Sequence, residues 1–234
     1  GDSHPILPLE SFALGFWTHF QKHKFLELGC NIVCMDSTHG TNAYDFELIT
    51  LMVMERNGTG LPVAWLISNL QDFKVLELFL IAIKEDASNE GEVPFSCPTK
   101  PPILVCLDPC HGSGSEKLLC SWHVLKDLKR KLTIIEDGAL RSTVYKNLCS
   151  IMVEVDSGMA KLAAEQLAAK LCDHIKTAAF GNYFKKEWMS CLSEWAAFRR
   201  IGAAINTNML LESFHWVLNY DYSNGKKNRR LDKL

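Results

Sequence analysis

Short, continuous apolar runs mark the first half of the chain, and apolar residues at helical spacing mark the second half. The runs at 31–35, within 44–56 and at 61–68 have the length and composition of strands buried in a sheet. Residues 57–60 (Asn-Gly-Thr-Gly) separate the last two runs, and Asn and Gly tolerate the positive φ of hairpin turns. The pattern therefore predicts three consecutive strands, of which the last two are antiparallel.

Helices are predicted on both sides of these strands in the sequence. Residues 11–24 place four aromatic side chains at the spacing of one helix face: Phe12, Phe16, Trp17 and Phe20. After the third strand, Asn69 or Asp72 can cap a helix whose wide apolar face extends to Ile83. We expect both helices to cover the sheet.

A fourth strand is predicted beyond the second helix. Residues 87–102 contain four prolines, which indicates an exposed connection. The apolar run at 103–107 then ends at Asp108, just as the first run ends at Asp36. Because a helical crossover between two strands implies parallel pairing, we expect these strands to lie side by side with their carboxylates close together.

The rest of the chain is predicted to be mainly helical. A short strand is expected at 117–123, and helices fit 124–135, 140–155, 159–177, 183–199 and, after a cap within 206–208, 209–222. The predicted fold class is therefore α/β, with a mixed sheet flanked by helices and an all-helical insertion before the last helix. The predicted domains are 1–123 (first part of the α/β core), 124–205 (helical insertion) and 206–234 (last core helix and a basic C-terminal segment).

Composition limits the environment and the partners. With 234 residues, 47% of them hydrophobic, the chain can bury a sizeable core, and its net charge of −2 means that a nucleic-acid surface would have to be a local patch. The nine cysteines form an odd set and several lie in apolar runs, which favours a reducing, intracellular compartment. The longest apolar stretch, near 78–83, is too short to span a bilayer, so we expect no membrane partner. The abrupt ends suggest a piece of a longer protein.

Three acids are candidates for chemistry: Asp36 and Asp108 at strand ends, and Glu212 on the last helix. A buried carboxylate needs pairing, hydrogen bonds or a metal, and for Asp36 alone hydrogen bonds from the following turn are the simpler interpretation. Together the three acids offer the hard oxygen ligands that suit Mg²⁺, and two such ions can support an in-line displacement at phosphorus. Their spacing alone is weak support because the chain has 27 acids.

Four sequence blocks give stronger support, and they occur in the order 36–42 (Asp-Ser-Thr-His-Gly-Thr-Asn), 48–68 with Leu-Pro-Val-Ala-Trp at 61–65, 119–124 (Leu-Cys-Ser-Trp-His-Val) and 207–215 (Thr-Asn-Met-Leu-Leu-Glu-Ser-Phe-His). From Phe12 onward the chain resembles the transposase domain of Mutator-like elements (MULEs). The resemblance implies a ribonuclease H-like fold, a DDE catalytic triad, and cleavage and joining of DNA with Mg²⁺ or Mn²⁺. It also implies a nuclear location and DNA partners, the transposon ends and a target, and leaves a homo-oligomer open.

By this resemblance, Asp36 matches the first acid of the triad, Asp108 the second and Glu212 the third. The metals would activate water to cleave one strand, and the freed 3′-hydroxyl would attack the target DNA without a covalent enzyme intermediate. His39 and His215 could approach the phosphate or the metals, although hydrogen bonding within a turn or on a helix face is the more common fate of a histidine.

Cys120 and His123 match the Cys-x-x-His element of the family. The pair supplies only two of the four ligands of a structural zinc site, so zinc cannot be inferred unless Cys110, His111 or other ligands join. A structural role is favoured for both residues.

Basic residues in two stretches are candidates for contacts with DNA phosphates: Lys126, Lys129, Arg130, Lys226, Lys227, Arg229 and Arg230. A run of charges is more often a solvated face. Neither stretch contains a base-reading motif, so sequence-specific recognition is expected outside this chain.

One departure from the family supports an alternative. Only eleven residues separate Asp108 from Cys120, whereas the family has a longer, partly helical segment there. The second hypothesis is therefore a catalytically inactive or domesticated transposase remnant that binds DNA or protein, and enzymatic activity stays open. A third, a ribonuclease H-like nuclease acting on another nucleic acid, uses the same acids with less support from the flanking blocks.

Overall fold

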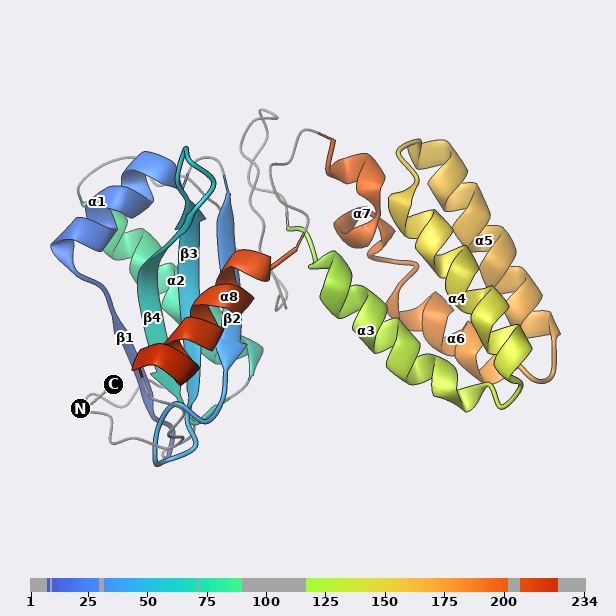
Figure 1. The fold of residues 1–234 in the computed structure, drawn as a ribbon, viewed down its shortest axis with the longest axis horizontal. Coiled ribbons are helices and arrows are strands. Elements are labelled where there is room, and N and C mark those ends of the chain that lie inside the picture. Colours follow the sequence, from blue (N-terminus) through green and yellow to red (C-terminus); the bar gives the residue numbers. More distant parts are fainter. Residues whose placement is uncertain are drawn as a thin grey trace. The chain divides into compact units, whose positions relative to one another are not determined.

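The computed structural model describes residues 8, 10–29, 32–70, 72–89, 117–201 and 207–222. It divides the chain into two units: Gly1–Lys117 with Asn208–Leu234, called the sheet unit below, and Leu118–Thr207, called the helical unit (Figure 1). The predicted combination of helices with a β-sheet is confirmed in the described residues. The division into 1–123, 124–205 and 206–234 stays a prediction, as does the parallel strand at 103–107, which lies outside the described residues.

A four-stranded antiparallel sheet forms the centre of the sheet unit, in the order β1-β4-β3-β2. Its described strands are β1 (Ala13–Phe16), β2 (Val33–Thr38), β3 (Glu47–Met54) and β4 (Gly60–Ser68). The three strands predicted from the apolar runs are confirmed, and so is the hairpin between the last two. Gly58 has a φ of 84° in the hairpin turn, a conformation that glycine adopts at little cost.

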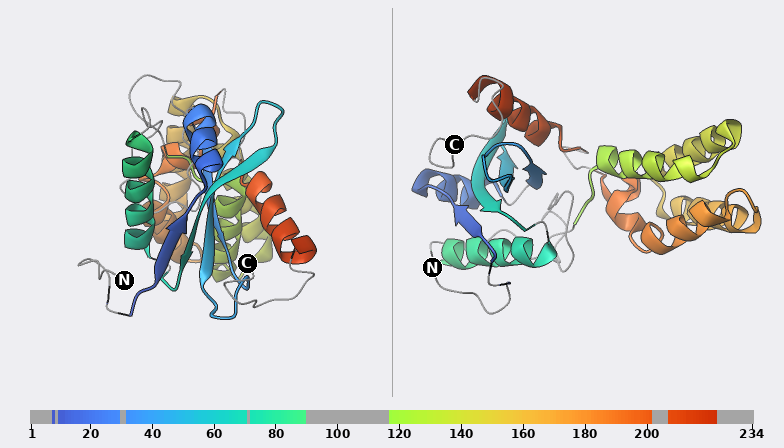
Figure 2. Two further views of the ribbon diagram at one scale, coloured as in Figure 1. Left: turned by 90° about the vertical axis from the view of Figure 1, so that its left-hand side faces the viewer. Right: turned by 90° about the horizontal axis from the view of Figure 1, so that it is seen from below.

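Helices cover both faces of this sheet (Figure 2). Strand residues alternate between the two faces, and Met35 and Leu51 lie in the core formed with α1 (His19–Leu28) and α2 (Phe73–Ser88). The other face carries Thr50, whose hydroxyl lies 3.0 Å from Nε2 of His215 on α8 (Met209–Val217). α8 continues as a π-helical segment, η3 (Leu218–Tyr222). The last helix is therefore part of the sheet unit.

Residues 11–24 do not form the single helix that their aromatic spacing predicted. β1 instead pairs with β4, where Phe16 lies opposite Trp65 with the two rings stacked at 5.5 Å. α1 begins after Thr18, whose hydroxyl accepts a hydrogen bond from the Gln21 N–H while the Gln21 side chain accepts one from the Thr18 N–H. This capping box fixes the start of α1, and its Thr-x-x-Gln signal was the sequence evidence against a longer helix.

Helices and short turns make up the helical unit: α3 (Ser121–Lys131), η1 (Leu132–Ile134), α4 (Gly138–Val153), α5 (Ser157–Asp173), α6 (Ala178–Glu187), α7 (Leu192–Trp195) and η2 (Ala197–Arg199). Asp137 and Asp156 cap α4 and α5 by accepting hydrogen bonds from first-turn N–H groups. Phe180, Phe184 and Trp195 are fully buried in its core. The predicted helical region is thus confirmed.

Two predictions within this region are wrong. Residues 117–120 have no regular structure and α3 begins at Ser121, where the sequence predicted a strand over 117–123. The helix predicted over 183–199 consists of the end of α6, then α7 and η2. The Trp195 indole N–H, at the end of α7, donates to the carbonyl oxygen of Trp188, the residue after α6, at 3.0 Å, so the chain folds back between these two residues.

Arg200 joins the two ends of the helical unit. Its guanidinium donates to the carbonyl oxygens of Leu119 and Glu194 and, at 3.2 Å, to the hydroxyl of Ser121. The Leu119 N–H also donates to the Glu194 carbonyl at 2.7 Å. Because Arg200 is 7% exposed, these hydrogen bonds form where water cannot readily replace them.

Two further features bear on the expected environment. No helix in the described ranges is long and apolar enough to cross a bilayer. None of the cysteines placed in those ranges, Cys34, Cys120, Cys149, Cys172 and Cys191, forms a disulfide bond with another described residue.

We expect Arg200→Met to lower the free energy of unfolding of the helical unit by about 1–3 kcal/mol, because partly buried carbonyl oxygens lose their donor. Urea unfolding combined with amide hydrogen exchange in α3 and α7 would measure this loss. Lys185→Met removes a charge from the exposed surface of α6 and should change the value by less than about 0.5 kcal/mol. Equal effects of the two substitutions would contradict the role given to Arg200.

Candidate functional site

Asp36 lies inside β2, before the last strand residue Thr38, and not at the strand end as predicted. The three residues that precede it are at most 3% exposed. It pairs in register with Thr50 of β3, which places its side chain on the face that α8 covers. Its Oδ1 accepts a hydrogen bond from the Ser37 N–H at 2.9 Å. A carboxylate is thus held at the margin of the apolar core.

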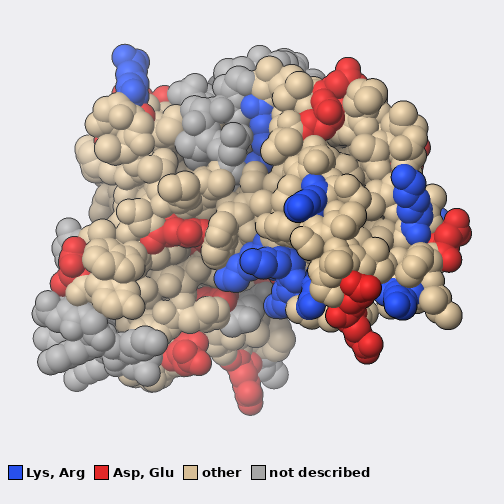
Figure 3. Space-filling model, turned by 45° about the vertical axis from the view of Figure 1, so that its right-hand side comes forward, with Lys and Arg blue, Asp and Glu red and all other residues tan. Residues whose placement is uncertain are grey.

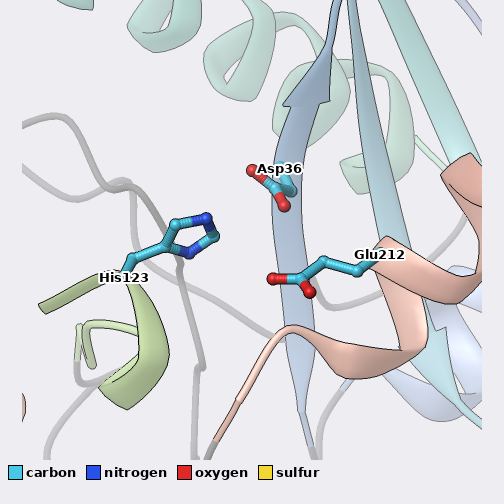
Figure 4. A group of neighbouring side chains, drawn as sticks. All are labelled: Asp36, His123 and Glu212. Carbon is cyan, nitrogen blue, oxygen red and sulfur yellow. The ribbon is translucent and has the colours of Figure 1, made fainter. Parts of the chain in front are cut away.

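Glu212 is held beside Asp36 by the packing of α8. Leu211 and His215 are both buried, and they fix which side of the helix faces the sheet. Glu212 lies in the first turn, and its side chain points toward β2 (Figure 4). The ligand oxygens of Asp36 and Glu212 lie within 4.8 Å of each other. The structure therefore brings together two predicted acids that are far apart in the sequence.

The environment of Asp36 disfavours its charged form. Burial raises the pKa of Asp36 to about 6, and the neighbouring charges of Glu212 and Glu47 add to the rise. Hydrogen bonds from the Ser37 N–H and from the Asn208 side chain oppose it. A proton or a cation between the two carboxylates would relieve this repulsion.

The side chain of Asn208 forms hydrogen bonds with β2 and does not cap α8. The sequence predicted a cap of α8 within residues 206–208. Asn208 occupies the cap position, yet its side chain makes no capping hydrogen bond to the helix. Its Nδ2 donates to the carbonyl oxygen of Met35 at 3.4 Å, and its side chain is hydrogen-bonded to Asp36. With 1% of its surface exposed, it links the start of α8 to the strand that carries Asp36.

A further acid near Asp36, Glu47, was not among the candidates predicted from the sequence. It opens β3 and is largely buried, and burial raises its pKa. Its Oε1 lies 2.9 Å from Nε2 of His39 and accepts a hydrogen bond from the Ser37 hydroxyl at 3.5 Å. His39, which could have approached phosphate, is thus engaged by Glu47. An acid directly before an apolar strand was the signal in the sequence.

His215 is a buried side chain of the α8–sheet contact. Burial lowers its pKa to about 4, so the ring is neutral near neutral pH. Its Nε2 is 3.0 Å from the Thr50 hydroxyl, and Thr50 is the cross-strand partner of Asp36. Helix-face hydrogen bonding, the more common fate expected for this histidine, is therefore what the structure shows.

Cys120 and His123 belong to the helical unit. Cys120 is buried directly before α3, and His123, also drawn in Figure 4, lies in the first turn of α3 with its ring edge-on to Trp122 at 4.8 Å. Within the described part of the helical unit, no third His, Cys, Asp or Glu completes a metal site with them. Zinc binding by this pair stays open, and the structural role favoured for both residues stays a prediction.

The basic candidates that the structure describes are on α3. Lys126 lies over the ring of Trp122 at 4.5 Å, Arg130 forms an ion pair with Asp127 at 2.8 Å, and Lys129 is exposed. On the face in Figure 3, Lys and Arg side chains form small groups separated by acidic and uncharged ones. Contact of these residues with DNA stays a prediction.

Five candidates lie outside the described residues: Asp108, Lys226, Lys227, Arg229 and Arg230. The described site therefore contains two of the three predicted acids. The position of the second acid relative to them stays a prediction.

Asp36→Asn should stabilise the metal-free protein at pH 7 by about 1–3 kcal/mol, as measured by denaturant unfolding in EDTA. The folded-state pKa of Asp36, about 6, lies above its ordinary value of 3.8, so ionisation favours unfolding. This penalty is complete above pH 6 and absent below pH 3.8. The gain from Asp36→Asn should therefore shrink as the pH falls through this window, and a gain that does not depend on pH would contradict the assignment.

His215→Gln should reduce the acid sensitivity of the fold. The folded-state pKa of about 4 lies below the ordinary 6.5, so stability from the neutral ring is complete above pH 6.5 and is lost as the pH falls toward 4. The loss amounts to about 3 kcal/mol in the wild-type chain. Unfolding free energies measured from pH 7 to pH 4 should fall less steeply in the variant. His23→Gln, at an exposed position of α1, is the matched control.

No protein-family model, no curated protein and no solved structure matches this chain. The chemical interpretation of the site therefore depends on the geometry of Asp36, Glu212 and Asn208 and on the sequence blocks that surround the first two.

Proposed function

We propose that this chain is a MULE-type DDE transposase domain with a ribonuclease H-like fold, which cleaves and transfers DNA strands with the help of divalent metal. The observation that carries the proposal is the proximity of Asp36 and Glu212, whose ligand oxygens lie within 4.8 Å. The antiparallel order β2-β3-β4, with the first acid on β2 and the last on α8, supports the same fold. DNA as the partner and the nucleus as the location are parts of this proposal.

The donor set fits Mg²⁺ or Mn²⁺. Two carboxylates in reach of one another are hard oxygen ligands, and such ions are commonly bound by one or two carboxylates together with phosphate oxygens of the substrate. Asp108 is the third ligand on this proposal. When bound, the metal supplies charge neutralisation and a Lewis acid for phosphoryl transfer.

The chain's own groups bind and orient. Asp36 and Glu212 hold the cation, and the Asn208 side chain keeps the Asp36 carboxyl in place while it joins α8 to the Met35 carbonyl. Because the pKa of Asp36 is raised to about 6, part of its population loses a proton when a cation binds near neutral pH. Metal affinity should therefore rise with pH across this range.

Calorimetric titration of the full chain with Mn²⁺ tests the metal site. The wild-type chain should bind, and at a free concentration 100 times the dissociation constant its unfolding free energy should rise by about 2.7 kcal/mol. Asp36→Asn and Glu212→Gln should each weaken binding at least about tenfold, because each removes a charged ligand. Glu85→Gln, on the exposed side of α2, should leave it unchanged.

Cleavage and joining of a labelled DNA duplex separate the transposase from the alternative, a domesticated or inactive remnant. The eleven residues between Asp108 and Cys120 support that alternative. Products that require metal, and that Asp36→Asn abolishes, would exclude the remnant. Metal binding by the wild-type chain without any DNA cleavage would favour the remnant. The absence of both metal binding and cleavage would contradict the metal site itself.

A further inference from the structure

A polar cavity of about 580 Å³ lies in the helical unit, between the first half of α5 and the segment that contains α7 and η2. Its size is that of a small-ligand site. Among the described residues, its polar lining consists of two cations, three hydroxyl groups and one acid: Lys161, Arg199, Ser157, Ser190, Ser193 and Glu165. The charged groups of the lining thus carry a net positive charge.

The α5 side of the cavity is built on one helix face. Ser157, Lys161 and Glu165 follow one another at intervals of four residues, so they lie along the same side of the helix. Lys161 forms no ion pair with any residue that the structure describes, Glu165 included, although the two are spaced for one. The ammonium group is therefore available to a ligand.

The opposite side of the cavity is anchored in the core. Leu192 is buried in the hydrophobic cluster of the helical unit, and Phe198 packs against the same cluster. Leu192 directly precedes Ser193 in the sequence, Phe198 directly precedes Arg199, and η2 packs against α5. The polar groups thus project from segments that the core holds in position.

We propose that this cavity binds a phosphate group, either free or within a nucleic-acid backbone. Lys161 and Arg199 neutralise the phosphate charge, and the serine hydroxyls donate hydrogen bonds to its oxygens. Glu165, one turn beyond Lys161, opposes the anion and limits its affinity. The proposed site lies wholly in the helical unit and does not depend on Asp36, Glu212 or a metal.

Binding to the full chain in EDTA tests this site, with inorganic phosphate followed by calorimetry and a single-stranded oligonucleotide followed by fluorescence anisotropy. Lys161→Gln and Arg199→Gln should each weaken binding by about tenfold, the loss expected for one charged hydrogen-bond donor. Glu165→Gln should strengthen binding, because it removes the one acid among the described residues of the lining. Lys185→Gln removes a cation from the exposed surface of α6 and should leave binding unchanged.

The two ligands separate the sources of the phosphate group. If Lys161→Gln weakens both, and lowers the salt dependence of oligonucleotide binding by about 0.7 in the log–log slope, the site holds a backbone phosphate. If only inorganic phosphate is affected, the site holds a free phosphate group. If Lys161→Gln and Lys185→Gln behave alike with both ligands while circular dichroism shows them folded, the proposal is overturned.

Discussion

The contact of His215 with Thr50 holds α8 against the sheet. The proximity of Asp36 and Glu212 depends on this position of α8. Leu211 is fully buried one turn before His215, so α8 has only one side that can face the strands. Glu212 directly follows Leu211, and this position places it beside β2, the strand in which Asp36 pairs with Thr50. Because the histidine ring is buried and neutral, this contact adds no positive charge that could balance the two carboxylates.

Polar groups are concentrated on the α8 face of the sheet, whereas the other face has a conventional apolar core. The side under α1 and α2 buries Val33, Met35, Leu51 and their neighbours. The side under α8 buries Thr50, Asn208 and His215 and partly buries Asp36. Burying polar groups costs stability unless each finds a partner, and Thr50, His215 and Asn208 each have one, whereas burial still raises the pKa of Asp36. The unfavourable environment of Asp36 is consistent with a ligand group that is complete only when a cation is present.

Local patterns in the sequence predicted much of this arrangement. The strands around Asp36 followed from continuous apolar runs, and α8 from its helical spacing. The approach of Glu212 to Asp36 followed from neither, and only the likeness of the flanking blocks to a transposase domain suggested it. Edge strand β1 was missed because its pairing with β4 is decided by a distant strand. The hydrogen bond of Asn208 with β2 and the pairing of Glu47 with His39 were also missed, because both depend on tertiary contacts.

The hydrogen bond from Arg200 to Leu119 spans 81 positions of the chain and has a consequence for how α8 reaches its place. Closing a flexible loop costs entropy that grows by about 0.6 kcal/mol with each doubling of its length. Between the end of α2 at Ser88 and the start of α8, folding of the helical unit reduces the effective loop from roughly 120 residues to roughly 40. This removes about 1.6 doublings, which is about 1 kcal/mol. The folded helical unit thus acts as a tether that lowers the entropic cost of docking α8 on the sheet.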